Sequence, residues 1–130
     1  MEITTFNPLI ATADAAPLIE LFEELGFEKR HTKKNIDGRE DIFDVRMKDA
    51  NGFCVDIAQA PGIQRDMMNI RMNVRDYDEA YELLAERGFV NAQGDHTNDS
   101  GTSKGTSMIA PSGFSIALSY HRRKGDPDRA

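Results

Sequence analysis

The segment Glu-Leu-Phe-Glu-Glu-Leu-Gly-Phe at residues 20–27 returns as Glu-Leu-Leu-Ala-Glu-Arg-Gly-Phe at residues 82–89. Five of the eight positions are identical, and the offset is 62 residues. Residues 51–57 and 112–118 also resemble each other, at an offset of 61. An offset of about 60 residues is longer than the periods of common solenoid repeats, and two copies do not make a solenoid. The sequence therefore predicts two homologous modules packed into one domain.

Each module carries the local signals of a β-α-β-β-β order. Asp14 is placed to cap the first helix, which Gly26 ends, and Asp76 and Gly88 take the same places in the second copy. The apolar positions of both helices follow helical spacing: Leu18, Leu21, Phe22 and Leu25, then Tyr77, Ala80, Tyr81 and Leu84. We predict one domain over residues 1–121, with module one at 1–60 and module two at 66–121. The polar residues 122–130 are expected to form a disordered tail.

Strand residues alternate between an apolar set and a polar set. In the strand at 68–74 the apolar set is Met68, Ile70, Met72 and Val74, and the polar set is Asn69, Arg71 and Asn73. We expect every apolar set to pack on a helix, including Phe53 and Phe114 at the starts of their strands. The fold class is therefore α+β, with paired, curved mixed sheets. Paired about a pseudo-twofold axis, the sheets would enclose a central trough lined by the polar sets, and a concave surface with convergent polar groups is a common ligand site.

The polar sets supply the candidate ligand-binding residues: Asn7, Arg46, Asp56, Asn69, Arg71, Asn73 and Ser119. Arg71 and Asp56 could form a purely structural pair or recognise an anion, and the sequence leaves both readings open. Asp44 and Lys48 share a face with Arg46 near a sheet edge, where we expect solvated side chains. The loop at 94–105 is either a lid or a plain hairpin connection. No catalytic residue is identified.

Composition excludes several functions. The chain has 130 residues and a net charge of −6 without a basic block, so nucleic-acid binding is not expected. No apolar run approaches the length of a membrane span, and the N-terminus shows no signal sequence. The single cysteine, Cys54, rules out an internal disulfide and fits a cytoplasmic protein.

The doubled β-α-β-β-β module, with a capped helix ending in Gly-Phe and a turn glycine before the last strand, resembles the vicinal oxygen chelate superfamily. The motifs at 14–27, 52–57, 76–89 and 113–118 carry this resemblance, which covers residues 1–121. Its members include glyoxalases, bleomycin-resistance proteins, extradiol dioxygenases and methylmalonyl-CoA epimerases. The resemblance specifies the fold well and the reaction poorly.

The resemblance implies where a metal would be held. In metal-using members, ligands lie seven residues before the helix-capping Asp and four residues after the turn glycine. The corresponding residues here are Asn7, Asp56, Asn69 and Ala117. A catalytic divalent site usually needs three strong protein ligands, and this set offers one carboxylate. We therefore expect no metal and no other cofactor.

The expected function is that of a glyoxalase- or bleomycin-resistance-like protein that binds or sequesters a small molecule in the trough between the modules. The resemblance implies a homodimer. The alternative is a lyase, isomerase or dioxygenase of the same superfamily, either metal-dependent or metal-free with Asp56 as base. A third reading is a sheet face that binds a protein partner.

Overall fold

The computed structural model describes residues 1–126, and the last four residues of the predicted tail lie outside the described ones. The chain divides into two compact units. The N-terminal unit is Asn7–Asn69, and the C-terminal unit is Met1–Phe6 with Ile70–Ala130. These boundaries fall within two strands, whereas the sequence places the module boundary at residues 61–65.

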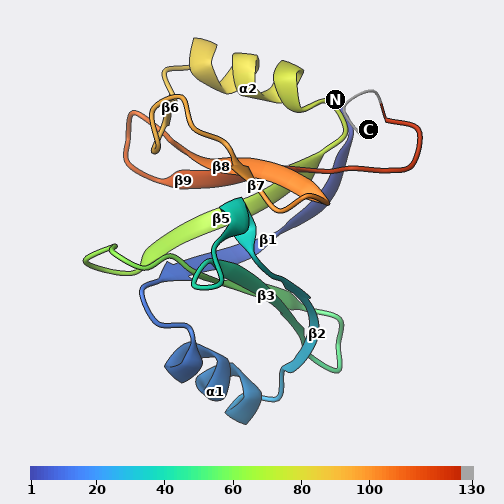
Figure 1. The fold of residues 1–130 in the computed structure, drawn as a ribbon, viewed down its shortest axis with the longest axis vertical. Coiled ribbons are helices and arrows are strands. Elements are labelled where there is room, and N and C mark those ends of the chain that lie inside the picture. The colour runs from blue at the N-terminus through green and yellow to red at the C-terminus, as the bar shows by residue number, and fades with distance from the viewer. Residues whose placement is uncertain (127–130) are drawn as a thin grey trace. The chain divides into compact units, whose positions relative to one another are not determined.

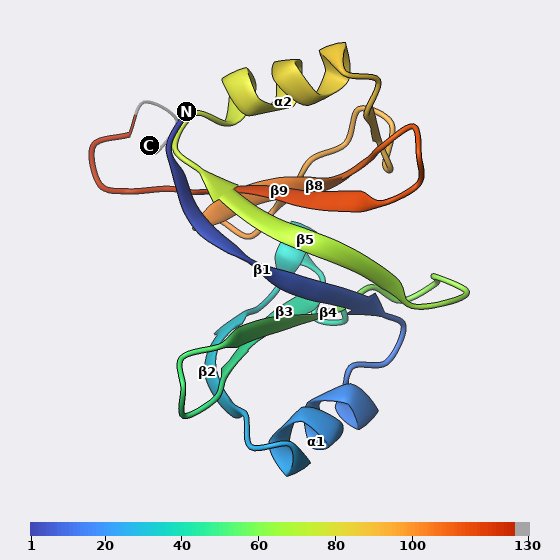
Figure 2. The ribbon, with the colours of Figure 1, turned by 180° about the vertical axis from the view of Figure 1, so that it is seen from behind.

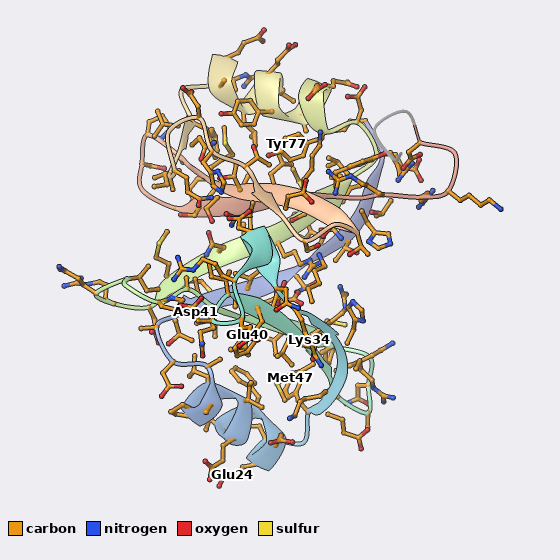
Figure 3. The ribbon with its side chains drawn as sticks, viewed as in Figure 1. Glu24, Lys34, Glu40, Asp41, Met47 and Tyr77 are labelled. Carbon is orange, nitrogen blue, oxygen red and sulfur yellow. The ribbon has the colours of Figure 1, made fainter. Side chains whose placement is uncertain are left out.

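The N-terminal unit contains one helix and a mixed sheet. Its elements are β1 (Ile3–Thr12, from Asn7 on), α1 (Ala16–Glu24), β2 (Glu28–Lys33), the short 3-10 helix η1 (Ile36–Gly38), β3 (Phe43–Lys48) and β4 (Cys54–Gln59). The strands lie in the order β2-β3-β4-β1, with β1 parallel to β4 and the other pairs antiparallel. Figure 1 shows α1 beside this sheet. Met47 of β3, which is labelled in Figure 3, packs in the core between the sheet and the helix. This core is therefore built against one face of the sheet, and the opposite face carries the polar residues.

The C-terminal unit has a sheet and a helix of its own. Its elements are β5 (Met67–Val74, from Ile70 on), α2 (Tyr77–Glu86), β6 (Val90–Asn91), β7 (Asn98–Asp99), β8 (Ser103–Ile109) and β9 (Ser115–His121). The strand order is β5-β9-β8-β6, and β7 pairs with β8. The start of β1 follows β5: the hydroxyl of Thr4 donates to the carbonyl of Asn73 over 3.4 Å. Figure 2 shows α2 alongside β8 and β9, and the predicted α+β class is confirmed.

The predicted cap and buried face are correct for α2 and only partly correct for α1. The α2 prediction matches, because Asp76 caps α2 through a 3.0 Å bond from the amide of Glu79, and Tyr77 and Ala80 are buried beneath it. For α1 the prediction is partly wrong. Ala15 takes the capping position, and Leu21 and Leu25 are exposed. Ile19 packs on the core beside Leu18 and Phe22, because the helix is rotated relative to the expected stripe.

The apolar strand sets are buried only where a helix covers them. Val45, Met47, Val55 and Ile57 form the predicted core face of β3 and β4. Phe53, Met68 and Phe114 are exposed, contrary to prediction. A helix of 9 residues spans about 14 Å, whereas a strand of eight residues spans roughly 26 Å, so residues at strand ends extend beyond the helix.

The repeated glycines Gly26 and Gly88 both have positive φ, 102° and 90°, in different surroundings. A Cβ at residue 88 would lie 2.9 Å from Cγ of Pro111, whereas nothing lies within 4 Å of one at residue 26. We expect Gly26→Ala to lower the free energy of unfolding by about 1 kcal/mol through backbone strain, and Gly88→Ala by about 2 kcal/mol because steric overlap adds to it. Urea unfolding of both variants measures the difference, and equal losses would contradict the steric contribution.

Candidate functional site

Three predicted residues form a hydrogen-bonded group on the polar face of the N-terminal unit. The amide Nδ2 of Asn7 donates to Oδ2 of Asp56 over 2.7 Å and to the carbonyl of Pro8 over 2.8 Å. The guanidinium Nη2 of Arg46 donates to Oδ1 of Asn7 over 3.4 Å. Arg46 and Asp56 are direct cross-strand partners in the register of β3 and β4. The group therefore runs across three neighbouring strands.

The three side chains of this group differ in their exposure to solvent. Asp56 has 0% exposure, and Asn7 is also buried. A buried carboxylate needs hydrogen bonds to offset its desolvation, and Asn7 supplies a short one. Arg46 is only half-buried. The arrangement makes Asp56 a support for Asn7, Asn7 a support for the guanidinium, and Arg46 the member that meets solvent.

Asn69 lies in the same unit, at the start of β5, the strand next to β1. Its exposure is 1%. Nδ2 donates weakly to the carbonyl of Met67 over 3.4 Å. Its Oδ1 accepts no hydrogen bond from any residue that the structure describes. A buried carbonyl oxygen without a donor is uncommon in proteins and requires an explanation.

The polar face of the C-terminal unit contains the other predicted residues. Arg71 and Asn73 are buried, and Nε of Arg71 donates to Oδ1 of Asn73 over 3.2 Å. Ser119 on β9 is half-buried and pairs across the sheet with Gly105 of β8. A Cβ at Gly105 would lie 2.6 Å from both Oγ of Ser119 and the backbone carbonyl oxygen of Leu118, so only glycine fits there without displacing the strand.

Asp44 corrects the expectation of a solvated sheet edge. Asp44 is 8% exposed, whereas Lys48, four residues further along β3, is an exposed residue. β2 pairs with β3 from Glu28–Lys48 to Lys33–Asp44, so β3 lies inside the sheet and not at its edge. The sequence identified the face of Asp44 correctly but not its burial, since nothing local marks which strand lies at the edge.

Sequence reasoning also missed a group of contacts on the helix side of the C-terminal unit. Arg75 lies over the ring of Tyr120 at 5.2 Å and donates to Oδ1 of Asp126 over 2.8 Å. A hydrogen bond from the Tyr120 hydroxyl, with further bonds from the Arg123 backbone and Arg75, lowers the pKa of Asp126 to about 2. Of the predicted tail, residues 122–126 therefore include an anchoring carboxylate.

The loop at 94–105 is bonded to its own unit. Arg122 forms two bonds to the carboxylate of Asp99, of 2.9 and 2.8 Å, and these lower the pKa of Asp99. At the other end, Nδ2 of Asn91 donates to the carbonyl of His96 over 3.0 Å. These contacts hold the described conformation of the loop against β8 and β9.

The four positions that the resemblance assigns to metal ligands carry residues that do not suit a metal. Asn7 and Asn69 offer neutral amides, Ala117 offers no ligand atom, and the carboxylate of Asp56 already accepts from Asn7. Within residues 1–126, no group of three or more His, Cys, Asp or Glu side chains could hold a metal ion. This donor set suits hydrogen bonding rather than divalent-metal coordination.

No helix within the described part of the chain is long and apolar enough to cross a membrane. No protein-family model matches the sequence. No curated protein matches it.

Solved structures do match. A methylmalonyl-CoA epimerase variant from Streptomyces coelicolor, in complex with 2-nitronate-propionyl-CoA, has a TM-score of 0.62 and 16% identity, covering 94% of this chain and 100% of that chain. A glyoxalase I variant from Zea mays has a TM-score of 0.63 and 16% identity, covering 92% of this chain and 44% of that one. A glyoxalase/bleomycin resistance protein/dioxygenase superfamily member from Vibrio splendidus has a TM-score of 0.56 and 17% identity, covering 92% and 99%. Such identities establish the fold alone, and this fold, shared with glyoxalase and epimerase structures, is the one that the resemblance in the sequence predicts.

Proposed function

We propose that this protein binds a small carboxylate-bearing molecule on the polar face of its N-terminal unit, without a metal, in the manner of the glyoxalase- and bleomycin-resistance-like proteins. The observation that carries the proposal is the supported guanidinium of Arg46. It is half-buried, it is oriented by Asn7 and Asp56, and it has one hydrogen bond within the described residues. A guanidinium has five N–H donors in a planar fork that matches a carboxylate, so most of its donors remain for a ligand.

Binding is favoured over catalysis by the position of Asp56. As a general base it would have to reach the ligand directly or through one water. Its exposure is 0%, and it accepts a 2.7 Å bond from Asn7. The carboxylate is therefore placed to orient the site rather than to take a proton from a bound molecule.

The variant Arg46→Ala tests the proposal. Its control is Lys48→Ala, which lies two residues further along the same face of β3. The probes are propionate, lactate, pyruvate and succinate, and the measurement is the thermal unfolding midpoint. A ligand at 100 times its Kd stabilises by about 2.7 kcal/mol, which is a clear midpoint shift. We expect at least one acid to shift the wild type and Lys48→Ala, and the shift to disappear in Arg46→Ala.

Either of two results would reject carboxylate binding at this face. One is that no acid shifts the midpoint of the wild type. The other is that the shift survives in Arg46→Ala.

The proposal extends to the setting of the protein. We expect a cytoplasmic homodimer that does not bind nucleic acid, as the charge balance and the resemblance imply. Sedimentation analysis at micromolar concentration measures the oligomeric state, and a monomer at all concentrations would contradict the dimer.

A further inference from the structure

The buried oxygen of Asn69 points to a second feature of the ligand. Resting on the proposed carboxylate binding, we propose that the ligand also carries an O–H or N–H donor, which Oδ1 of Asn69 accepts. Oδ1 has no partner within residues 1–126, and the side chain is 1% exposed. An unpartnered buried carbonyl oxygen loses its hydrogen bond to water and gains nothing in exchange, which costs roughly as much as a lost hydrogen bond.

The strand order places Asn69 on the strand beside that of Asn7, the residue that the guanidinium of Arg46 contacts. Arg46, Asp56 and Asn7 occupy β3, β4 and β1, and β5 with Asn69 is the next strand. The guanidinium of Arg46 already extends across β4 to within 3.4 Å of Oδ1 of Asn7. Since neighbouring strands lie about 4.8 Å apart, a molecule of a few carbon atoms is long enough to reach from one strand to the next.

The neighbouring amide shows why the donor must come from the ligand. Asn7 is satisfied at both ends: its Nδ2 donates to Asp56 and Pro8, and its Oδ1 accepts from Arg46. Asn69 has only the long bond from Nδ2 to the carbonyl of Met67. Asn69 therefore has a weaker donor bond than Asn7 and, unlike Asn7, an acceptor that is left open.

This chemistry defines a class of ligand, namely a carboxylic acid with a hydroxyl or amide hydrogen a few atoms away. Because Asn69 has almost no exposed surface, entry of the donor must displace a neighbouring side chain. The new hydrogen bond offsets part of that work, since Oδ1 gains a partner that it lacks in the described state.

The experiment compares the wild type with Asn69→Leu, and uses Asn51→Leu in an exposed turn as the control. Without any ligand, Asn69→Leu should raise the unfolding midpoint, because an apolar side chain of similar size removes the unsatisfied oxygen. Asn51→Leu should not raise it. A lower midpoint for Asn69→Leu, with Asn51→Leu unchanged, would show that Asn69 is satisfied and would overturn the inference.

Ligand selectivity is the second readout, with lactate and propionate as probes. Lactate has the hydroxyl donor that propionate lacks. We expect lactate to bind the wild type roughly fivefold more tightly than propionate, which is the ratio of dissociation constants that one ordinary hydrogen bond produces. In Asn69→Leu we expect this ratio to fall to about one. Equal affinities in the wild type, or an unchanged ratio in Asn69→Leu, would overturn the inference while leaving carboxylate binding intact. Loss of binding for both acids in Arg46→Ala separately confirms the proposed function, and absence of binding to the wild type overturns both.

Discussion

Asp56→Ala should lower the free energy of unfolding by about 3 kcal/mol, because it removes a fully buried carboxylate from its hydrogen-bonded group. The loss has a specific source in the 2.7 Å bond that Asn7 donates to Asp56. Without that acceptor, a buried N–H of Asn7 is left without one of its partners. Asp56→Asn keeps the shape of the side chain and should lose less. Urea unfolding monitored by circular dichroism measures both changes.

The control for this prediction is Asp66→Ala, which removes an exposed carboxylate from the same unit. Substitutions at exposed positions usually change stability by about 0.5 kcal/mol or less. If Asp56→Ala and Asp66→Ala unfolded at the same urea concentration, the hydrogen-bonded group would have no structural role. The support that we assign to Asp56 beneath Asn7 and Arg46 would then be wrong.

Met47→Ala should lower the free energy of unfolding by about 3 kcal/mol, since it leaves a cavity in the core between β3 and α1. Met47 has 0% exposure and packs with the buried side chains Val45, Val55 and Ile57. Deleting its thioether removes those contacts, and a core held by a single 9-residue helix has little else to fill the space. Guanidinium unfolding gives the change.

Met68→Ala is the matched control, because Met68 is a strand methionine of the same unit with 65% exposure. Its loss should change stability by about 0.5 kcal/mol or less. The pair separates burial from residue type. A large effect at Met68, or a negligible one at Met47, would contradict the assignment of the core face.

The local elements could be predicted from the sequence because their signals are local. Asp76 caps α2 as predicted, since the capping oxygen and the amide of Glu79 are three residues apart. The alternation in β3 and β4 correctly assigned Val45 and Ile57 to the core and Asp56 to the polar face. Backbone conformation follows from near neighbours, so motifs of a few residues are sufficient to predict it.

Burial could not be predicted in the same way. Leu21 and Leu25 fit the apolar stripe of α1 yet are exposed, and Ile19 packs on the core instead. Asp44 was expected to be solvated near a sheet edge, but β3 lies between β2 and β4 and Asp44 is buried. Both outcomes depend on which element lies alongside, and the spacing of residues within one element carries no such information.

The candidate site shows the same division. The residue types of Asn7, Arg46, Asp56 and Asn69, and the face of the sheet on which each strand presents them, follow from the sequence and its repeat. Only the tertiary structure decided that Asn7 bonds Asp56, 49 residues away, and that Oδ1 of Asn69 is left without a donor. The physical reason is the range of the interactions. Strand alternation is set along the chain, whereas hydrogen-bond satisfaction and burial are set by the register between strands that meet only when the sheet forms.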